Sequence, residues 1–187
     1  MSTQQNQNKL AKYISPERLK HSLAVERDAL ELARRWGADC EKATLAGLFH
    51  DIAKGMTGPA MLERARTAGL PVSALEAENP KLLHGKIGAL ITEDELGITD
   101  PEILSAIRKH TFGSENMSLL EKIIYLADHL EPGRIYPGVA KARAIAFKDL
   151  DQAIVATAEA TLAFLKNKGA SIDPQTIKTR DWYRNKL

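Results

Sequence analysis

Helix-opening signals recur along this chain, and they constrain its fold more than any other feature. Ser15-Pro16, Asp100-Pro101 and Asp173-Pro174 each place a capping side chain before a proline at the first helical position. Ser118 with Glu121 three residues later has the pattern of a capping box. Apolar residues after these openings recur at helical spacing, and no convincing series of strands with alternating polarity is found. The sequence therefore predicts an all-α fold.

Length and composition indicate a single domain. The chain has 187 residues, of which 44% are hydrophobic and 27% charged, as in a globular protein with one sizeable core. No repeat, low-complexity segment or linker divides it. We expect a helical bundle of about seven to nine helices over residues 10–187, preceded by a disordered polar tail at residues 1–9.

Charge and cysteine content exclude several kinds of partner. The net charge of +2 is too balanced for a protein that wraps nucleic acid or binds an anionic membrane surface. No apolar run approaches the ~20 residues of a membrane span, and the polar N-terminus lacks the apolar region of a signal peptide. The lone Cys40 cannot form an internal disulfide, which favours a reducing compartment. We therefore expect a cytoplasmic protein without a nucleic-acid or membrane partner.

Residues that could bind metal are distributed over the predicted helices. His50 and Asp51 stand side by side in the apolar stretch Ala46-Gly-Leu-Phe-His-Asp-Ile-Ala-Lys54. Adjacent helical positions point about 100° apart, so this doublet cannot close a site without residues from other helices. Side chains from several helices can converge on the core of a bundle. The candidate partners are His21, His84, His110 and Asp128.

The order of these residues resembles the signature of the HD phosphohydrolase superfamily, and the two extra histidines resemble its two-metal versions. A closer resemblance, to the bacterial YqeK family, covers about residues 10 to 167. The segments that carry it are Arg18-x-x-His21-Ser22, the stretch from Ala46 to Lys54, His84-Gly85, Ile107-x-x-His110-Thr111-x-Gly113, Tyr125-Leu-Ala-Asp128 and Glu131-Pro-Gly-Arg-x-x-Pro-Gly-Val139. That family consists of symmetrical bis(5′-nucleosyl)-tetraphosphatases. The resemblance implies an HD-domain enzyme that hydrolyses diadenosine tetraphosphate to two ADP.

The same residues suit a site with two metals. Asp51 has two carboxylate oxygens and is the natural bridge between two cations. We expect one cation to be completed by His21, His50 and Asp128, and the other by His84 and His110. Mixed imidazole and carboxylate ligands suit iron, manganese or zinc, and iron is our first expectation. Such a pair can hold a shared hydroxide as the nucleophile and also bind phosphoryl oxygens.

Cationic side chains near this set are candidates for binding a polyphosphate. Lys54 lies four residues after His50 and three after Asp51, so we expect it beside them, acting in catalysis and on phosphate. Arg18 and Arg134 are further candidates, since arginine suits bidentate phosphate contact. Tyr136 could line a base pocket or pack its own loop. His129 should point away from the metals, because it is only one position from Asp128.

Two other functions remain open from the sequence. One is a different HD reaction, such as that of a nucleotidase or a cyclic-nucleotide phosphodiesterase, since ligand spacing says little about the pocket walls. The other is a non-catalytic metal- and nucleotide-binding sensor, against which the retention of Lys54 with a full ligand set argues. In each case the partner is a small nucleotide, and the chain could form a homodimer.

Overall fold

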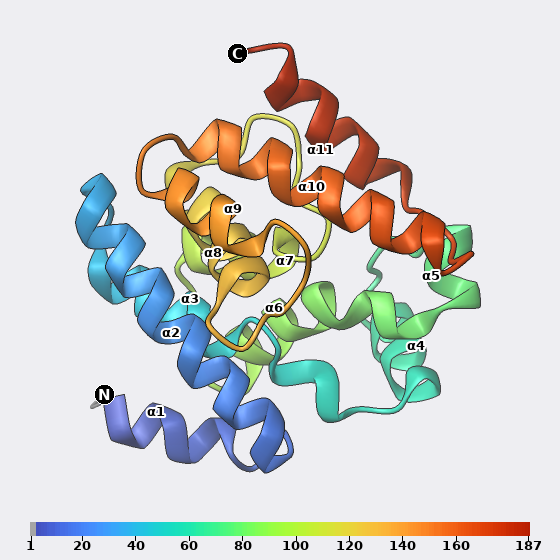
Figure 1. Ribbon diagram of the computed structural model, residues 1–187. Helices are drawn as coiled ribbons and strands as arrows, with labels where there is room; N and C mark the ends of the chain where they lie inside the picture. Colours follow the sequence, from blue (N-terminus) through green and yellow to red (C-terminus); the bar gives the residue numbers. More distant parts are fainter. Residues whose placement is uncertain (1–2) are drawn as a thin grey trace.

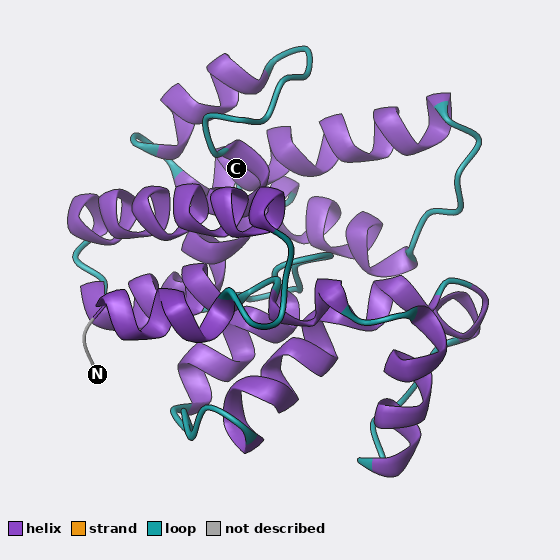
Figure 2. Ribbon diagram, turned by 90° about the horizontal axis from the view of Figure 1, so that it is seen from below, coloured by secondary structure: helices purple, strands orange, loops and turns teal. Residues whose placement is uncertain are grey.

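The structure, a computed structural model, describes residues 3–187 and consists of helices and connecting loops over that range (Figures 1 and 2). None of the described helices is long and apolar enough to cross a membrane. The all-α prediction is confirmed, with more helices than expected. In chain order they are α1 (Thr3–Leu10), α2 (Pro16–Trp36), α3 (Cys40–Phe49), the 3-10 helix η1 (Ile52–Gly55), α4 (Gly58–Thr67), α5 (Ala74–Glu78), the 3-10 helix η2 (Pro80–Leu83), α6 (His84–Asp94), α7 (Pro101–Lys109), α8 (Leu119–Leu130), α9 (Val139–Ala146), α10 (Leu150–Asn167) and α11 (Pro174–Arg184).

The N-terminal segment differs from the prediction. A disordered tail was expected at residues 1–9; residues 1–2 lie outside the described range, but Thr3–Leu10 forms helix α1. The polar sequence of α1 has little helical tendency of its own, so its stability must come from tertiary contacts. Leu10 is fully buried, Asn6 is buried, and Gln7 Nε2 donates to Glu26 Oε2 of α2 at 3.0 Å.

Helix α8 lies at the centre of the molecule (Figure 1). Its start is fixed by the predicted capping box, in which Ser118 and Glu121 satisfy each other's backbone N–H groups. The apolar side chains that follow are buried against α2, α3, α7, α9 and α10. Each fully buried leucine or isoleucine stabilises the fold by about 1.5–3 kcal/mol. This burial carries Asp128, in the last turn of α8, into the interior.

Three of the candidate histidines lie at helix ends rather than inside helices. The helix expected to run through Lys54 ends at Phe49, and Asp51, at φ −105° and ψ 12°, leads into η1. The helix expected from Pro80 begins as η2, and α6 starts at His84. Helix α7 ends one residue before His110. A backbone carbonyl near such a helix end has a lone pair free to accept a hydrogen bond from a histidine ring.

The C-terminal helix α11 lies along α10 and closes one side of the core (Figure 1). Tyr183 is fully buried, and its hydroxyl accepts a hydrogen bond from Met117 N at 2.7 Å. Thr179 donates from Oγ1 to the carbonyl of Phe112 at 2.9 Å. These two bonds fasten α11 to the loop between α7 and α8, the loop that begins at His110.

Candidate metal centre

The six predicted ligands lie together in the interior of the bundle. Their ligand atoms form three overlapping groups in which all atoms are within 4.8 Å of one another. The side chain of His21 is 18% exposed, and the other five residues are buried. The groups are His21 with His50 and Asp51, His50 with His110 and Asp128, and Asp51 with His84 and His110.

Asp51 lies between two sets of imidazoles. Its Oδ2 is 3.6 Å from His50 Nε2 and 3.8 Å from His21 Nε2. Its Oδ1 is 3.6 Å from His84 Nε2 and 3.4 Å from His110 Nε2. Oδ1 is also buried with no hydrogen-bond partner among the described residues. A buried carboxylate oxygen without a donor is costly, and a cation would satisfy it. The cluster therefore fits the binding of divalent metal.

The ring orientations leave nitrogen lone pairs directed at this centre. Backbone carbonyls only accept hydrogen bonds, so the ring nitrogen that contacts one carries the proton. Nδ1 of each of three rings donates at 2.7 Å to the carbonyl three residues earlier, in the pairs His50 to Gly47, His84 to Lys81 and His110 to Ile107. Their Nε2 atoms are then acceptors. Nε2 of His84 is 3.0 Å from that of His110, a close approach of acceptors that a shared cation would stabilise.

Burial and neighbouring charge favour the metal-binding protonation state of His84, Asp51 and Asp128. For His21, burial alone would lower the pKa, but Asp128 raises it. Burial, with the charge of Lys54, lowers the pKa of His84 to about 3. Burial alone would raise the pKa of Asp51, but His50, His110 and Lys54 hold it well below the usual range. The pKa of Asp128 is also lowered well below the usual range, because its interactions with His21 and His50 outweigh the effect of burial. At neutral pH His84 is therefore neutral and both carboxylates are ionised, as ligands must be.

Two of the three candidate phosphate-binding cations contact the cluster. Lys54 Nζ is 2.9 Å from Asp51 Oδ2. Arg134 donates from Nη2 to Asp128 Oδ1 and from Nε to the carbonyl of the same residue at 2.8 Å. Arg18 is exposed, one helical turn before His21, and its guanidinium has no ion pair among residues 3–187. Lys54 and Arg134 thus contact the carboxylates, whereas no contact between the Arg18 side chain and the cluster is found among residues 3–187.

Tyr136 and His129 lie beside the cluster without joining it. The Tyr136 hydroxyl donates to the carbonyl of His129 at 3.2 Å, which packs the loop after α8. His129 Nδ1 donates to the carbonyl of Tyr125 at 2.8 Å, and the two rings are 4.5 Å apart between centroids. The distance from His129 Nδ1 to Asp128 Oδ2 is 4.0 Å. His129 belongs to none of the three ligand groups, as its place in the helix suggested.

Two residues that sequence reasoning did not assign also contact the ligands. Thr111 Oγ1 is 3.1 Å from His84 Nε2 and 3.3 Å from His110 Nε2. Glu131 Oε1 is 3.3 Å from His21 Nδ1. Both lie inside segments that carry the family resemblance. Their presence there was the only signal in the sequence, because nothing about a threonine or glutamate in a loop indicates a partner on another helix.

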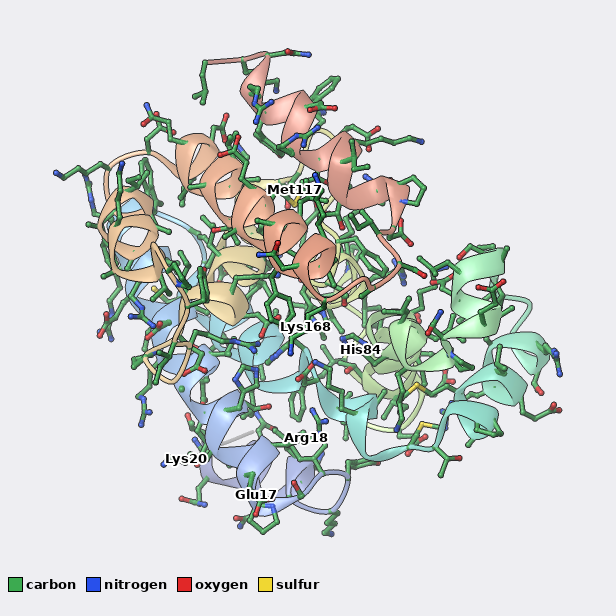
Figure 3. All side chains as sticks on the ribbon, turned by 45° about the vertical axis from the view of Figure 1, so that its right-hand side comes forward. Glu17, Arg18, Lys20, His84, Met117 and Lys168 are labelled. Carbon is green, nitrogen blue, oxygen red and sulfur yellow. The ribbon has the colours of Figure 1, made fainter. Side chains whose placement is uncertain are left out.

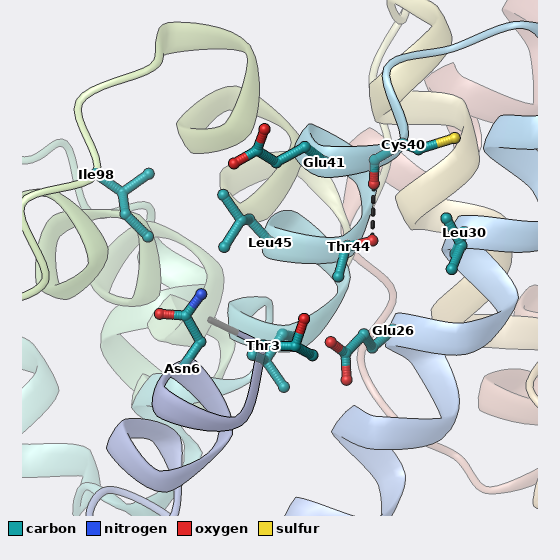
Figure 4. A pocket seen from close by; sticks show the side chains of 10 residues that line it. Thr3, Asn6, Glu26, Leu30, Cys40, Glu41, Thr44, Leu45 and Ile98 are labelled. Atoms are coloured by element: carbon teal, nitrogen blue, oxygen red, sulfur yellow. Dashed lines mark hydrogen bonds between the residues drawn. The ribbon is translucent and has the colours of Figure 1, made fainter. Parts of the chain in front are cut away.

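A cavity of about 470 Å³ lies apart from this cluster, between α1, α2 and α3 (Figure 4). Its wall includes Leu30, Leu45, Leu48 and Ile98 together with the buried carboxyl of Glu26. None of the six candidate ligands lines it. The cavity is therefore separate from the metal centre.

Known proteins share both the fold and the sequence. A family model described as HD domain matches residues 18–133. The symmetrical bis(5′-nucleosyl)-tetraphosphatase of Bacillus subtilis (strain 168) is 40% identical over 169 residues, which cover 90% of each chain. That of Halalkalibacterium halodurans is 42% identical over 167 residues, covering 89% of each. The crystal structure of a predicted HD superfamily hydrolase involved in NAD metabolism from Clostridium acetobutylicum is 37% identical, with a TM-score of 0.95 over 100% of this chain and 99% of that one.

An all-helical fold around a buried histidine and aspartate cluster defines the class of this protein as an HD-domain hydrolase. The chain belongs to the HD domain family and, within it, to the YqeK-like family of symmetrical bis(5′-nucleosyl)-tetraphosphatases. The resemblance that the sequence segments indicated is thereby confirmed.

Proposed function

We propose that this protein hydrolyses diadenosine tetraphosphate at its centre, giving two ADP, with two divalent transition metals and iron as the first choice. The substrate comes from the relatives, which carry that activity in their names and match about nine tenths of the chain. The observation that carries the two-metal assignment is Asp51, whose two oxygens face separate pairs of imidazoles. Mixed nitrogen and oxygen ligands suit iron, manganese or zinc better than calcium or magnesium.

The six proposed ligands can be assigned to two ions. Asp51 would touch both, with His21, His50 and Asp128 completing one set and His84 and His110 the other. When bound, such ions lower the pKa of water and offset the charge of phosphoryl oxygens. The chain itself supplies orientation and positive charge. Backbone carbonyls hold the histidine rings in place, and Lys54 and Arg134 are close enough to the carboxylates to bind the phosphates of a substrate lying across the centre.

Two expectations from the sequence stay predictions beside this proposal. One is the cytoplasmic location, which was expected from the lone Cys40 and from a sequence without a membrane-span or signal-peptide pattern. The other is the homodimer, for which no interface residues are assigned.

Analysis of the products in water enriched with ¹⁸O tests the proposed reaction. Central cleavage puts one solvent oxygen on one of the two products, so ADP should be the sole nucleotide product and half of its molecules should be labelled. AMP and ATP in equal amounts would show asymmetrical cleavage and contradict the proposal. Rapid turnover of a mononucleotide or cyclic nucleotide, with diadenosine tetraphosphate untouched, would establish a different HD reaction. Nucleotide binding without any turnover would indicate a sensor.

Replacement of Arg18 by alanine should weaken substrate binding without affecting the metals. The exposed guanidinium lies one turn before His21 and can reach only the outer part of a polyphosphate. We expect KM to rise about tenfold, since a single charge-assisted contact contributes about 1.5–3 kcal/mol at most, with kcat nearly unchanged. Lys20→Ala is the matched control, because Lys20 is also exposed but lies on a different side of α2 (Figure 3). Equal effects of the two substitutions on KM would remove Arg18 from the substrate site.

A further inference from the structure

His21 differs from the other histidines of the centre in what holds its ring. His50, His84 and His110 each donate from Nδ1 to a nearby backbone carbonyl at a helix end. His21 lies in the second turn of α2, where the backbone carbonyls are occupied by helical hydrogen bonds. A ring at such a position needs a side-chain acceptor. The acceptor that faces Nδ1 is Glu131, whose Oε1 is 3.3 Å from it, across 110 residues of sequence. The other ring nitrogen, Nε2, faces the centre and lies 3.1 Å from Asp128 Oδ1.

The Glu131 carboxylate is held firmly on its other side. Glu131 is 6% exposed and lies directly after α8. Its Oε2 accepts a hydrogen bond from Gly133 N at 2.6 Å. A Cβ atom on Gly133 would lie 2.9 Å from Oε1 and 3.0 Å from Oε2, closer than such atoms approach. The absence of a side chain at Gly133 therefore leaves space for the Glu131 carboxylate, which packs against the backbone of the loop.

The backbone of this loop is fixed by one arginine from α9. Arg143 Nη2 donates to the carbonyl of Glu131 at 2.6 Å and to that of Arg134 at 2.9 Å. Arg143 Nε donates to the carbonyl of Leu130. Three carbonyls bonded to one planar guanidinium leave the loop little freedom to move. The position of Glu131 is thus set from α8, from Gly133 and from α9 together.

We propose that Glu131 is a positioning residue, which keeps the proton of His21 on Nδ1 and its Nε2 lone pair directed at the metal centre. A carboxylate hydrogen-bonded to the far nitrogen of a metal-binding histidine fixes its tautomer and raises its basicity. His21 is the most exposed of the six ligands, so without Glu131 its ring would be free to turn toward solvent. The inference rests on the proposed role of His21 as a metal ligand.

The tautomer of His21 can be read directly from ¹⁵N NMR of the metal-free protein labelled in histidine, with the His21 signals assigned by comparison with His21→Gln. At a pH where the His21 ring is neutral, we expect the wild type to carry the proton on Nδ1. In Glu131→Ala we expect a mixture of tautomers, with part of the proton on Nε2 beside Asp128 Oδ1. Glu131→Gln, which keeps an acceptor oxygen but loses the charge, should retain most of the Nδ1 tautomer. Gly133→Ala, which keeps the carboxylate but displaces it, should shift the tautomer toward the mixture.

Binding of Mn²⁺ to the same variants provides the second readout. We expect the dissociation constant to rise about 10- to 100-fold in Glu131→Ala, and less in Glu131→Gln. Glu121→Ala is the matched control, because Glu121 is a buried carboxylate at the opposite end of α8, bound by Ser105 and Lys109. It should lose stability yet leave the His21 tautomer unchanged.

An unchanged tautomer and unchanged Mn²⁺ affinity in Glu131→Ala would overturn the positioning role. The same conclusion would follow if Glu121→Ala altered both quantities as much. Failure of the wild type to bind any of Fe²⁺, Mn²⁺ and Zn²⁺ would instead contradict the proposed function, and the tautomer measurement would still decide the role of Glu131.

Discussion

Replacement of Asp51 by alanine is expected to remove both the bound metal and the turnover. Among residues 3–187, Asp51 is the one side chain whose two oxygens face both sets of imidazoles, and it is buried between them. Its loss should lower kcat by at least about 10³-fold, as for other residues that act as part of a catalytic unit. Metal content should fall to background. Steady-state kinetics and elemental analysis measure these two quantities, and circular dichroism establishes that the variant is folded.

His129→Ala is the matched control for Asp51→Ala, since His129 is a histidine one residue from a proposed ligand. Its Nδ1 is bonded to the carbonyl of Tyr125, and its ring packs on Tyr125. We expect activity within several-fold of the wild type and full metal content. Comparable metal losses in the two variants would show that the ligand set is wrongly assigned.

A large loss of stability is expected for Gly55→Ala. Gly55 ends η1, directly after Lys54, and a Cβ there would lie 2.0 Å from the backbone carbonyl oxygen of Tyr13. Backbone cannot move aside as a flexible side chain can, so the chain must separate locally. We expect the free energy of unfolding to fall by about 3 kcal/mol, near the upper end for overpacking. In a chain of this length that corresponds to a decrease in Tm of about 6–12 °C.

Gly69→Ala is the control for Gly55→Ala. It shows how much stability is lost when a glycine is replaced without a clash such as that with the Tyr13 carbonyl. Gly69 has φ +63°, and a Cβ there would meet nothing within 4 Å. The substitution should cost only the strain of a left-handed alanine, about 1 kcal/mol. Thermal unfolding of both variants under the same conditions measures the difference. If Gly55→Ala were no less stable than Gly69→Ala, the packing of η1 against Tyr13 would be wrong.

The helices were predictable where capping and apolar spacing agree. The capping box at Ser118 and the proline openings at Pro16, Pro101 and Pro174 all begin helices in the structure. Helix α1 was not predictable, because its polar residues are ordered by contacts with Glu26 and with the core around Leu10. Those contacts join residues far apart in the sequence, and helix propensity, which depends on neighbouring residues, cannot predict them.

The candidate site was predictable in its residues but not in its local backbone. The residues assigned from their order in the chain do converge. Histidine and carboxylate side chains are common metal ligands, and they can be recognised in a sequence by residue type alone. The helix is interrupted between Phe49 and Ile52, where the sequence has no proline or glycine that would predict an interruption. A continuous helix was therefore expected there. The contact between Glu131 and His21 depends on how the loop after α8 returns to α2, which sequence spacing does not contain.

The number of metal ions bound per chain tests the central claim of a centre bridged by Asp51 most directly. The protein should be purified without oxygen, saturated with Fe²⁺ or Mn²⁺, freed of unbound metal and subjected to elemental analysis with its concentration measured independently. Six ligand side chains, of which one is a bridging carboxylate, predict about two ions per chain. A value of at most one ion under saturating conditions would contradict the two-metal centre and leave a site for a single ion.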